Sequence, residues 1–258
     1  MWLRIIVGII VFVSLAPILV VIPMSFTSSS FFQFPIPGYS FEWYLKFFNN
    51  EEWVIGLLRS LFIAIFTSIL STILGIMASL AVTRLNFWGK KLFMSLMIAP
   101  MIIPVIIIGV ALYHSFAPLK LTNSFVGLVL AHTVLAIPIV FVTVTASLKG
   151  MDRNLELVAM GLGSTPLGSF FKVTLPIIKP GVLSGALFAF IISFDEVVVT
   201  IFLGGANTKT LPIAMWENLR IQIDPTMAAV SSILIVITVA AFILQEVFSM
   251  RKARAKKA

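Results

Sequence analysis

Cysteine is absent from the 258 residues, and histidine occurs only twice, at His114 and His132. Without cysteine the chain can form neither disulfides nor thiolate metal sites. A single histidine beside an apolar segment is more often a hydrogen-bonded packing residue than a ligand. We therefore expect no metal site in this chain and assign no chemistry to either histidine.

Charged residues are scarce as well. They make up 11% of the sequence, against 60% hydrophobic residues and a mean hydropathy of +1.11. Soluble domains carry about 25% charged residues, so this chain has too little polar surface to cover a water-exposed globule. A soluble domain is excluded, and the composition is typical of an integral membrane protein.

What the sequence has instead is long apolar runs, and a helix needs about 20 apolar residues to cross a bilayer. We predict an all-α polytopic protein, one membrane domain over 1–250 with a basic tail over 251–258. The first run is longer than a signal-peptide core, so we expect it to be retained. Pro100 and Pro104 in the third run and Pro138 in the fourth predict kinks. The six predicted transmembrane helices are roughly 4–25, 57–82, 92–113, 125–147, 181–203 and 228–248.

The basic residues indicate which side each connection faces. Thirteen of the 18 Lys and Arg residues fall in one set of connecting segments, and the side richer in Lys and Arg is cytoplasmic. Both termini and the connection 148–180 are therefore expected in the cytoplasm. This asymmetry, with anionic lipid at the inner surface, accounts for the net charge of +8, so no nucleic-acid partner is expected. The cytoplasmic set is Arg4, Arg84, Lys90, Lys91, Lys149, Arg153, Lys172, Lys179, Arg251, Lys252, Arg254, Lys256 and Lys257.

The opposite, outer set holds Lys46, Arg59, Lys120, Lys209 and Arg220. On that side the segment 26–56 contains SFEWYLKFF. Ser40 can cap a short helix there, and Trp43 and Tyr44 suit a membrane interface. We expect a short helix that rests on the membrane surface.

The cytoplasmic connection 148–180 is rich in Gly, Ser, Thr and Pro, unlike its surroundings. Leu155, Val158, Ala159 and Leu162 have the i, i+3, i+4, i+7 spacing of an amphipathic helix, with Asp152 or Asn154 as its cap. Gly161 and Gly163 suit the end of that helix, because glycine adopts the left-handed conformation freely.

A second short helix is predicted directly after these glycines. Ser164 or Thr165 can cap it, and Pro166 fits its first turn. It should run through LGSFFKV and end before Pro176. The connection is then a helix–Gly–helix elbow, which either lies on the membrane or docks into a groove of a partner protein.

This elbow resembles the signature of binding-protein-dependent ABC importer permeases: E-A-A, three residues, G, nine residues, I, one residue, L-P. The spacing fits throughout, and Glu156 stands one position before the expected Glu. The resemblance implies the type I ABC importer permease fold, with the elbow as a coupling helix that seats in a cleft of an ATP-hydrolysing subunit. The corresponding positions are Leu157, Val158 and Ala159 for E-A-A, Gly163 for G, Val173 for I, and Leu175 with Pro176 for L-P. Of these, Leu157, Val158 and Val173 depart from the residue types of the signature.

The resemblance extends over the whole chain. WYLKFF, LLRSLFIA, APMIIP and SFDEVVVTIFLGG…LPIAMWENLRIQIDPTMAAVSSILI are similar to permeases of spermidine/putrescine importers. This resemblance implies that the chain lies in the bacterial inner membrane and forms half of the transmembrane pathway for a small cationic solute. The implied partners are a dimer of ATP-binding subunits, a second permease subunit expected to be a different chain, an extracytoplasmic solute-binding protein and membrane lipid. ATP and Mg²⁺ would bind to the ATPase, with no cofactor and no catalytic residue in this chain. The outer segment 26–56 and the loop 204–226 would contact the binding protein.

Two acids, Asp195 and Glu196, interrupt the fifth apolar run. A charge there costs at least ~2.5–3.5 kcal/mol, so it should face the interior of the bundle. Adjacent helical residues project about 100° apart, so both acids cannot face one cavity. We favour Asp195 as a lining residue of a cation pathway. Phe190, Phe194 and Phe202 would offer aromatic faces for cation–π contacts.

Other interpretations stay open. One acid could instead pair with Arg59, Thr200 or a neighbouring subunit. Within the family the solute could be ferric ion, thiamine, an aminophosphonate or an opine. A proton-coupled secondary carrier that uses Asp195 or Glu196 is a further alternative. It is disfavoured because the sequence shows no clear inverted repeat and because it leaves the elbow unexplained.

Overall fold

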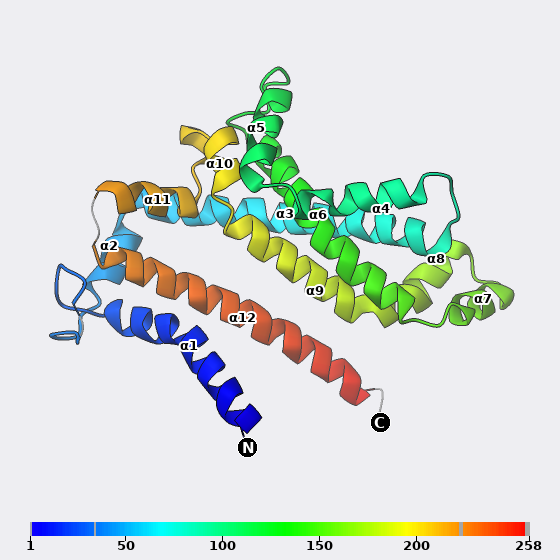
Figure 1. The fold of residues 1–258 in the computed structure, drawn as a ribbon, viewed down its shortest axis with the longest axis horizontal. Coiled ribbons are helices and arrows are strands. Elements are labelled where there is room, and N and C mark those ends of the chain that lie inside the picture. Colours follow the sequence, from blue (N-terminus) through cyan, green and yellow to red (C-terminus); the bar gives the residue numbers. More distant parts are fainter. Residues whose placement is uncertain (1, 34, 222–223, 256–258) are drawn as a thin grey trace.

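Helices make up nearly all of the regular structure in the computed structural model, which describes residues 2–33, 35–221 and 224–255 (Figure 1). No strand occurs among these residues; the one isolated β-bridge joins Thr27 and Tyr39. The predicted all-α class is confirmed. The helices are α1 (Trp2–Met24), α2 (Glu42–Asn49), α3 (Glu51–Arg84), α4 (Lys90–Ile98), η1 (Ala99–Met101), α5 (Val105–Phe116), α6 (Phe125–Lys149), α7 (Asn154–Gly161), α8 (Pro166–Ser169), η2 (Phe170–Thr174), α9 (Leu175–Phe194), α10 (Val198–Leu203), η3 (Ala206–Thr208), α11 (Leu211–Ile221) and α12 (Thr226–Ala255).

The prediction of six spans is confirmed only in part. In the described chain four continuous helices are long and apolar enough to cross a membrane: α1, α3, α6 and the stretch Pro166–Phe194. A bent pair, Lys90–Met101 with Val105–Phe116, makes a fifth if it counts as one span. The last predicted span lies in α12, whose described apolar part, Thr226–Ala240, is shorter than a full span. Lys256 and Lys257 of the basic tail lie outside the described residues.

The third predicted span, 92–113, is the one that differs most from a straight helix. Its two parts meet at an angle of 106°. Pro104 directly precedes α5, and proline both lacks an N–H and restricts the residue before it, so the first helix ends there. Pro138, by contrast, lies inside α6, which continues through it.

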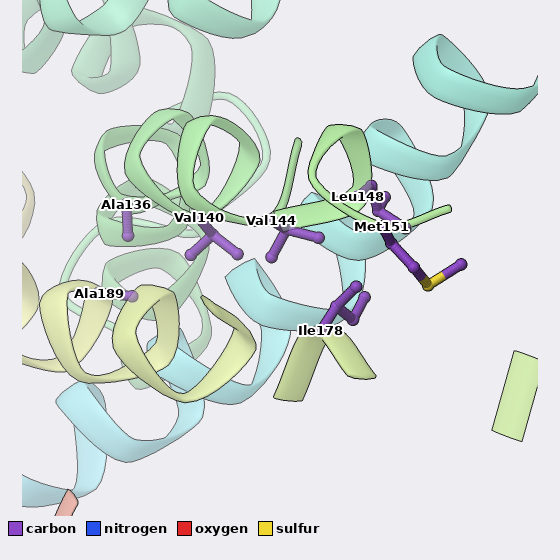
Figure 2. Packing of buried hydrophobic residues seen from close by; sticks show 7 residues of the cluster. All are labelled: Ala136, Val140, Val144, Leu148, Met151, Ile178 and Ala189. Atoms are coloured by element: carbon purple, nitrogen blue, oxygen red, sulfur yellow. The ribbon is translucent and has the colours of Figure 1, made fainter. Parts of the chain in front are cut away.

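The core of the molecule is formed by α3, α6 and α9, which pack along one another (Figure 1). Small residues allow this close approach, as is common between membrane helices. A Cβ added at Gly75 of α3 would lie 2.6 Å from the Val140 side chain, and one at Gly185 of α9 would lie 3.3 Å from the Val140 Cα. Figure 2 shows the apolar cluster between α6 and α9, made of Ala136, Val140, Val144, Leu148, Met151, Ile178 and Ala189.

The remaining helices flank this core on two sides. α5 and α10 pack together and project on one side in Figure 1, whereas α1 and α12 lie together on the other. No residue of α1 is buried. The flanking helices therefore leave wide apolar surfaces for lipid or for other subunits.

The outer segment differs from the surface helix that the sequence predicts. Ser40 accepts a hydrogen bond from the Glu42 backbone at 3.1 Å, but the N-cap residue of α2 is Phe41, so the predicted cap at Ser40 is wrong. Trp43 is only 5% exposed, and its indole N–H donates to the Thr27 carbonyl at 2.7 Å. The Tyr44 hydroxyl lies 2.7 Å from that of Ser25. Both aromatic residues thus fix α2 to the preceding loop, because each has a polar group that finds a partner inside the chain.

Candidate functional site: the elbow and the interrupted helix

The elbow forms at the predicted residues. α7 follows Asp152, whose carboxylate accepts from the Asn154 backbone at 2.9 Å. Gly163 has a φ of +94°, which reverses the chain after α7, as a residue without a Cβ does at low cost. The Thr165 hydroxyl then caps α8 by accepting from the Gly168 N–H at 3.0 Å. The predictions for Gly163 and Thr165 are confirmed.

The end of the second elbow helix was predicted wrongly. It does not stop before Pro176 but passes through a π-helical turn, η2, directly into α9. There the Leu175 N–H donates to the Phe170 carbonyl, five residues back. A helix can continue through such a wider turn next to a proline, whose missing N–H breaks the regular ladder. The elbow is therefore continuous with a core helix.

The predicted apolar face of α7 is not covered by the chain itself. Leu162 is 84% exposed, and Leu155, Leu157 and Val158 are also exposed, whereas Ala159 is half-buried. Exposed apolar patches of this kind mark interaction sites. Of the other positions that correspond to the signature, Val173 and Leu175 are half-buried and Pro176 is exposed.

A cavity of about 690 Å³ lies between the elbow and the end of α3. Its walls are mainly apolar side chains. Those from α3 include Ile73, Met77 and Leu80, and those from the elbow include Leu157, Met160, Leu167, Phe170 and Phe171. The elbow therefore stands away from the end of α3 rather than packing flat against it.

Glu156 holds the elbow to α3. The Arg84 guanidinium donates to both carboxylate oxygens, Nε to Oε2 and Nη2 to Oε1, each at 2.8 Å. The Thr174 hydroxyl donates to Oε1 at 2.7 Å, and the Ser169 hydroxyl donates to the Glu156 carbonyl at 3.3 Å. A two-pronged contact of this type between arginine and carboxylate fixes orientation as well as distance.

The protonation of Glu156 agrees with this arrangement. Burial raises the pKa of its carboxyl, but the hydrogen bonds from Arg84 and Thr174 and the charges of Arg84 and Arg153 outweigh burial, so the pKa lies below its usual value of 4.5. Glu156 is thus ionised at neutral pH, with its charge engaged inside the chain.

The second feature is a break in the predicted fifth span. The expected continuous helix over 181–203 is wrong: α9 ends at Phe194, and α10 begins at Val198. Glu196 explains the new start, because its carboxylate accepts from the Val199 N–H at 2.9 Å. A carboxylate in this position caps a helix and is favoured by the helix dipole. Glu196 therefore has a structural role within the chain.

Asp195 lies at the other side of this break, at the C-terminal end of α9. Its side chain is exposed, and no hydrogen bond or ion pair to it is found within the described residues. Arg59, a predicted partner, instead donates to the Ala206 carbonyl at 3.2 Å. Thr200, the second predicted partner, donates to the Glu196 backbone carbonyl at 2.9 Å. Of the two acids, Asp195 is the one left available.

Trp216, which the sequence did not indicate, is the aromatic residue that shares a cavity with Asp195. A cavity of about 310 Å³ beside Asp195 is lined by Trp216 and contains none of the three predicted phenylalanines. Phe190 and Phe194 stack on each other with ring centres 5.5 Å apart. Phe202 packs against Gly109 of α5, where an added Cβ would lie 2.7 Å from its ring.

Arg84, Thr174 and Trp216 were missed by sequence reasoning. In the sequence, Arg84 counted only as one of the Lys and Arg residues that indicate the cytoplasmic side. Its ion-pair partner, Glu156, lies 72 residues away. Trp216 is 21 residues beyond Asp195 and lies in α11, within the segment 204–226 that the sequence suggested was a loop. No local pattern in the sequence predicts the ion pair of Arg84 with Glu156 or the cavity that Trp216 shares with Asp195.

The comparisons with known proteins identify this architecture. The family of binding-protein-dependent transport system inner membrane components matches residues 71–254. The chain belongs to this family. It is the permease component of an ABC importer, as the elbow and the whole-chain resemblance predicted.

Curated relatives are similar over most of their length. The spermidine/putrescine transport system permease protein PotC of Haemophilus influenzae is 30% identical over 235 residues, 91% of this chain and 91% of that protein. The putrescine transport system permease protein PotI of Escherichia coli K12 is 31% identical over 227 residues, 85% of this chain and 80% of that protein.

Solved structures share the fold at low identity. A bacterial ABC transporter that imports the acidic polysaccharide alginate matches with a TM-score of 0.71 and 15% identity, over 96% of this chain and 94% of that chain. The alginate transporter in complex with an alginate-pentasaccharide-bound periplasmic protein matches with a TM-score of 0.71 and 13% identity, over 97% and 93% of the two chains.

Proposed function

We propose that this permease carries a small organic cation of the polyamine type, such as putrescine or spermidine. The observation that carries the proposal is Asp195, an exposed carboxylate at a helix break inside an apolar segment, without a partner in the described chain. A carboxylate that is costly to keep in such a place suits a pathway for cations. The names of the two curated relatives point to the same class of solute.

The geometry around Asp195 fits an alkylammonium group. The α9 C-terminus adds the negative end of a helix dipole to the carboxylate. Trp216 lies on the wall of the same cavity as the carboxylate. An ammonium can bind between an aromatic ring and a carboxylate.

In the proposed assembly, the elbow and both termini lie on the cytoplasmic side of the inner membrane. The elbow docks its exposed apolar face into an ATP-binding subunit, one of a dimer that binds ATP and Mg²⁺. A second permease subunit completes the pathway. The segment 26–56 and the segment 204–226, which contains α11, face the other side, where a solute-binding protein delivers the cation.

A movement of the elbow can be transmitted to the core helices in two ways. One route is covalent, because α8, η2 and α9 form one continuous helical stretch. The other is the contact of Glu156 with Arg84 at the end of α3. Since α3 and α9 both pack on α6, a displacement of the elbow would move two of the three core helices.

The docking role can be tested by purifying the tagged chain from its native membrane in mild detergent and identifying the proteins that come with it. We expect an ATPase subunit with the unaltered chain and its loss with Gly163→Asp, while the chain itself still inserts. A Cβ at Gly163 would meet no atom of the chain within 4 Å, so the added carboxylate would act on the partner surface and on the left-handed turn.

The matched control is Lys91→Ala, which removes an exposed charge from α4 outside the elbow. Recovery of the ATPase with Gly163→Asp, together with ATP-driven uptake at the full rate, would exclude the docking role of the elbow.

A further inference from the structure

His132 bridges the two helices on either side of the break. It lies in α6, is 1% exposed, and uses both ring nitrogens. Nδ1 lies 2.9 Å from the Ser193 hydroxyl, in the last turn of α9. Nε2 lies 3.0 Å from the Thr200 hydroxyl, in α10. One imidazole therefore spans the interruption at residues 195–197 from a third helix.

Both hydroxyls can pair with the ring whichever nitrogen carries its proton, because a hydroxyl can donate or accept a hydrogen bond. The Thr200 hydroxyl also lies 2.9 Å from the Glu196 carbonyl. The contacts therefore run from Ser193 through His132 and Thr200 to the backbone at Glu196.

These hydrogen bonds stabilise the break between α9 and α10, where the regular backbone hydrogen bonds of a continuous helix are interrupted. Ser193, His132 and Thr200 are all buried, so a lost partner would leave a polar group without water. Such a group costs far more than an exposed one, and linked bonds strengthen each other. The apolar contacts of α10 with α6, through Val199 and Leu128, do not reach across the break to α9.

We infer that His132 is a positioning residue of the permease: it holds α9 and α10 in their relative orientation and so limits access to Val197 within the break. The role goes beyond the proposed function and holds whichever solute the chain carries. It assigns a function to a histidine whose spacing in the sequence suggested none.

The absence of native cysteine makes a direct test possible. A single reporter, Val197→Cys, is placed in the break, where Val197 is half-buried. The full-length chain in native membranes is then labelled with a membrane-impermeant cationic thiol reagent. With His132→Asn, which cannot bridge both hydroxyls, the labelling rate should rise at least about fivefold, the factor that corresponds to one lost buried hydrogen bond.

Two comparisons separate this role from general loosening. Thr133→Val removes a buried hydroxyl of the same helix that donates to the Val129 carbonyl at 2.6 Å, and it should leave the rate unchanged. A second reporter, Leu162→Cys at the elbow tip, should label equally with and without His132→Asn.

The two hydroxyl partners provide an independent arm. Ser193→Ala and Thr200→Val should each raise labelling of Val197→Cys, and combining either one with His132→Asn should add little, because the bridge is already broken. An unchanged rate in His132→Asn, or an equal rise in Thr133→Val, would overturn the inference. If His132→Asn does not reach the membrane, an unchanged rate in both hydroxyl variants would overturn it instead.

Discussion

Glu156 and Asp195 are both carboxylates in apolar surroundings, yet the chain satisfies only one of them. Both oxygens of Glu156 accept hydrogen bonds, from Arg84 and Thr174, at the junction of the elbow and α3. Asp195 has no such partner in the described residues, although its neighbour Glu196 caps α10. The difference separates a carboxylate that joins the elbow to α3 from one that, in the function we propose, is available to the transported cation.

The contrast is most strongly tested at Glu156. Glu156→Ala and Arg84→Ala should each lower uptake at least about tenfold, because removing one partner of a mostly buried ion pair costs on the order of 2 kcal/mol or more. The side chains of Arg84 and Glu156 are only 17% and 13% exposed. The measurement is uptake of radiolabelled putrescine and spermidine into whole cells.

Lys91→Ala is the control for Arg84→Ala, since it removes an exposed cation at the same end of the molecule. Uptake in the control should be unchanged. Equal losses in Lys91→Ala and Arg84→Ala would mean that only the total charge at that end matters.

The other half of the comparison concerns Asp195. Asp195→Asn should lower uptake up to about fivefold, the loss that one missing contact of about 1 kcal/mol between an exposed carboxylate and a cation gives, while the chain still copurifies with its partners. Glu196→Gln should have little effect, because the Gln side-chain carbonyl can still accept from Val199. Normal uptake kinetics in Asp195→Asn would rule out its place in the pathway.

A smaller effect is expected at the elbow turn. Gly163→Ala forces a residue with a Cβ into the left-handed conformation, at a cost of roughly 1–2 kcal/mol. Gly161→Ala is the matched change in the right-handed helix α7, with open space around its Cβ. Tryptic cleavage at Arg153 and Lys172, both exposed, should speed up in Gly163→Ala and not in Gly161→Ala. Equal cleavage in the two variants would show that the turn contributes nothing.

The local features of this fold were readable from the sequence because they depend on neighbouring residues. The spacing of Leu155 and Leu162, the left-handed turn at Gly163 and the cap at Thr165 each follow from side-chain chemistry within one or two helical turns. The apolar runs likewise located α1, α3 and α6, since these runs are long and apolar enough to span a bilayer as single helices.

What the sequence could not provide depends on contacts over long separations or on competition between signals. Arg84 meets Glu156 only because the fold brings the end of α3 to the elbow. The break at residues 195–197 sits in an otherwise apolar run, where a cap by Glu196 and a bridge from His132 prevail over hydropathy. Pro176 predicted the end of the second elbow helix, but that helix continues through a π-helical turn, which accommodates the missing N–H of the proline.

The most direct test of the contrast is uptake by the charge-swapped double variant, Arg84→Glu with Glu156→Arg. Each single reversal should abolish uptake, because it places two like charges at the joint between the elbow and α3. The double variant should recover to within roughly fivefold of the unaltered chain, the remainder being the hydrogen bond that Thr174 loses. A double variant as inactive as either single reversal would contradict the account, since it would mean that Glu156 acts against a partner protein rather than against Arg84.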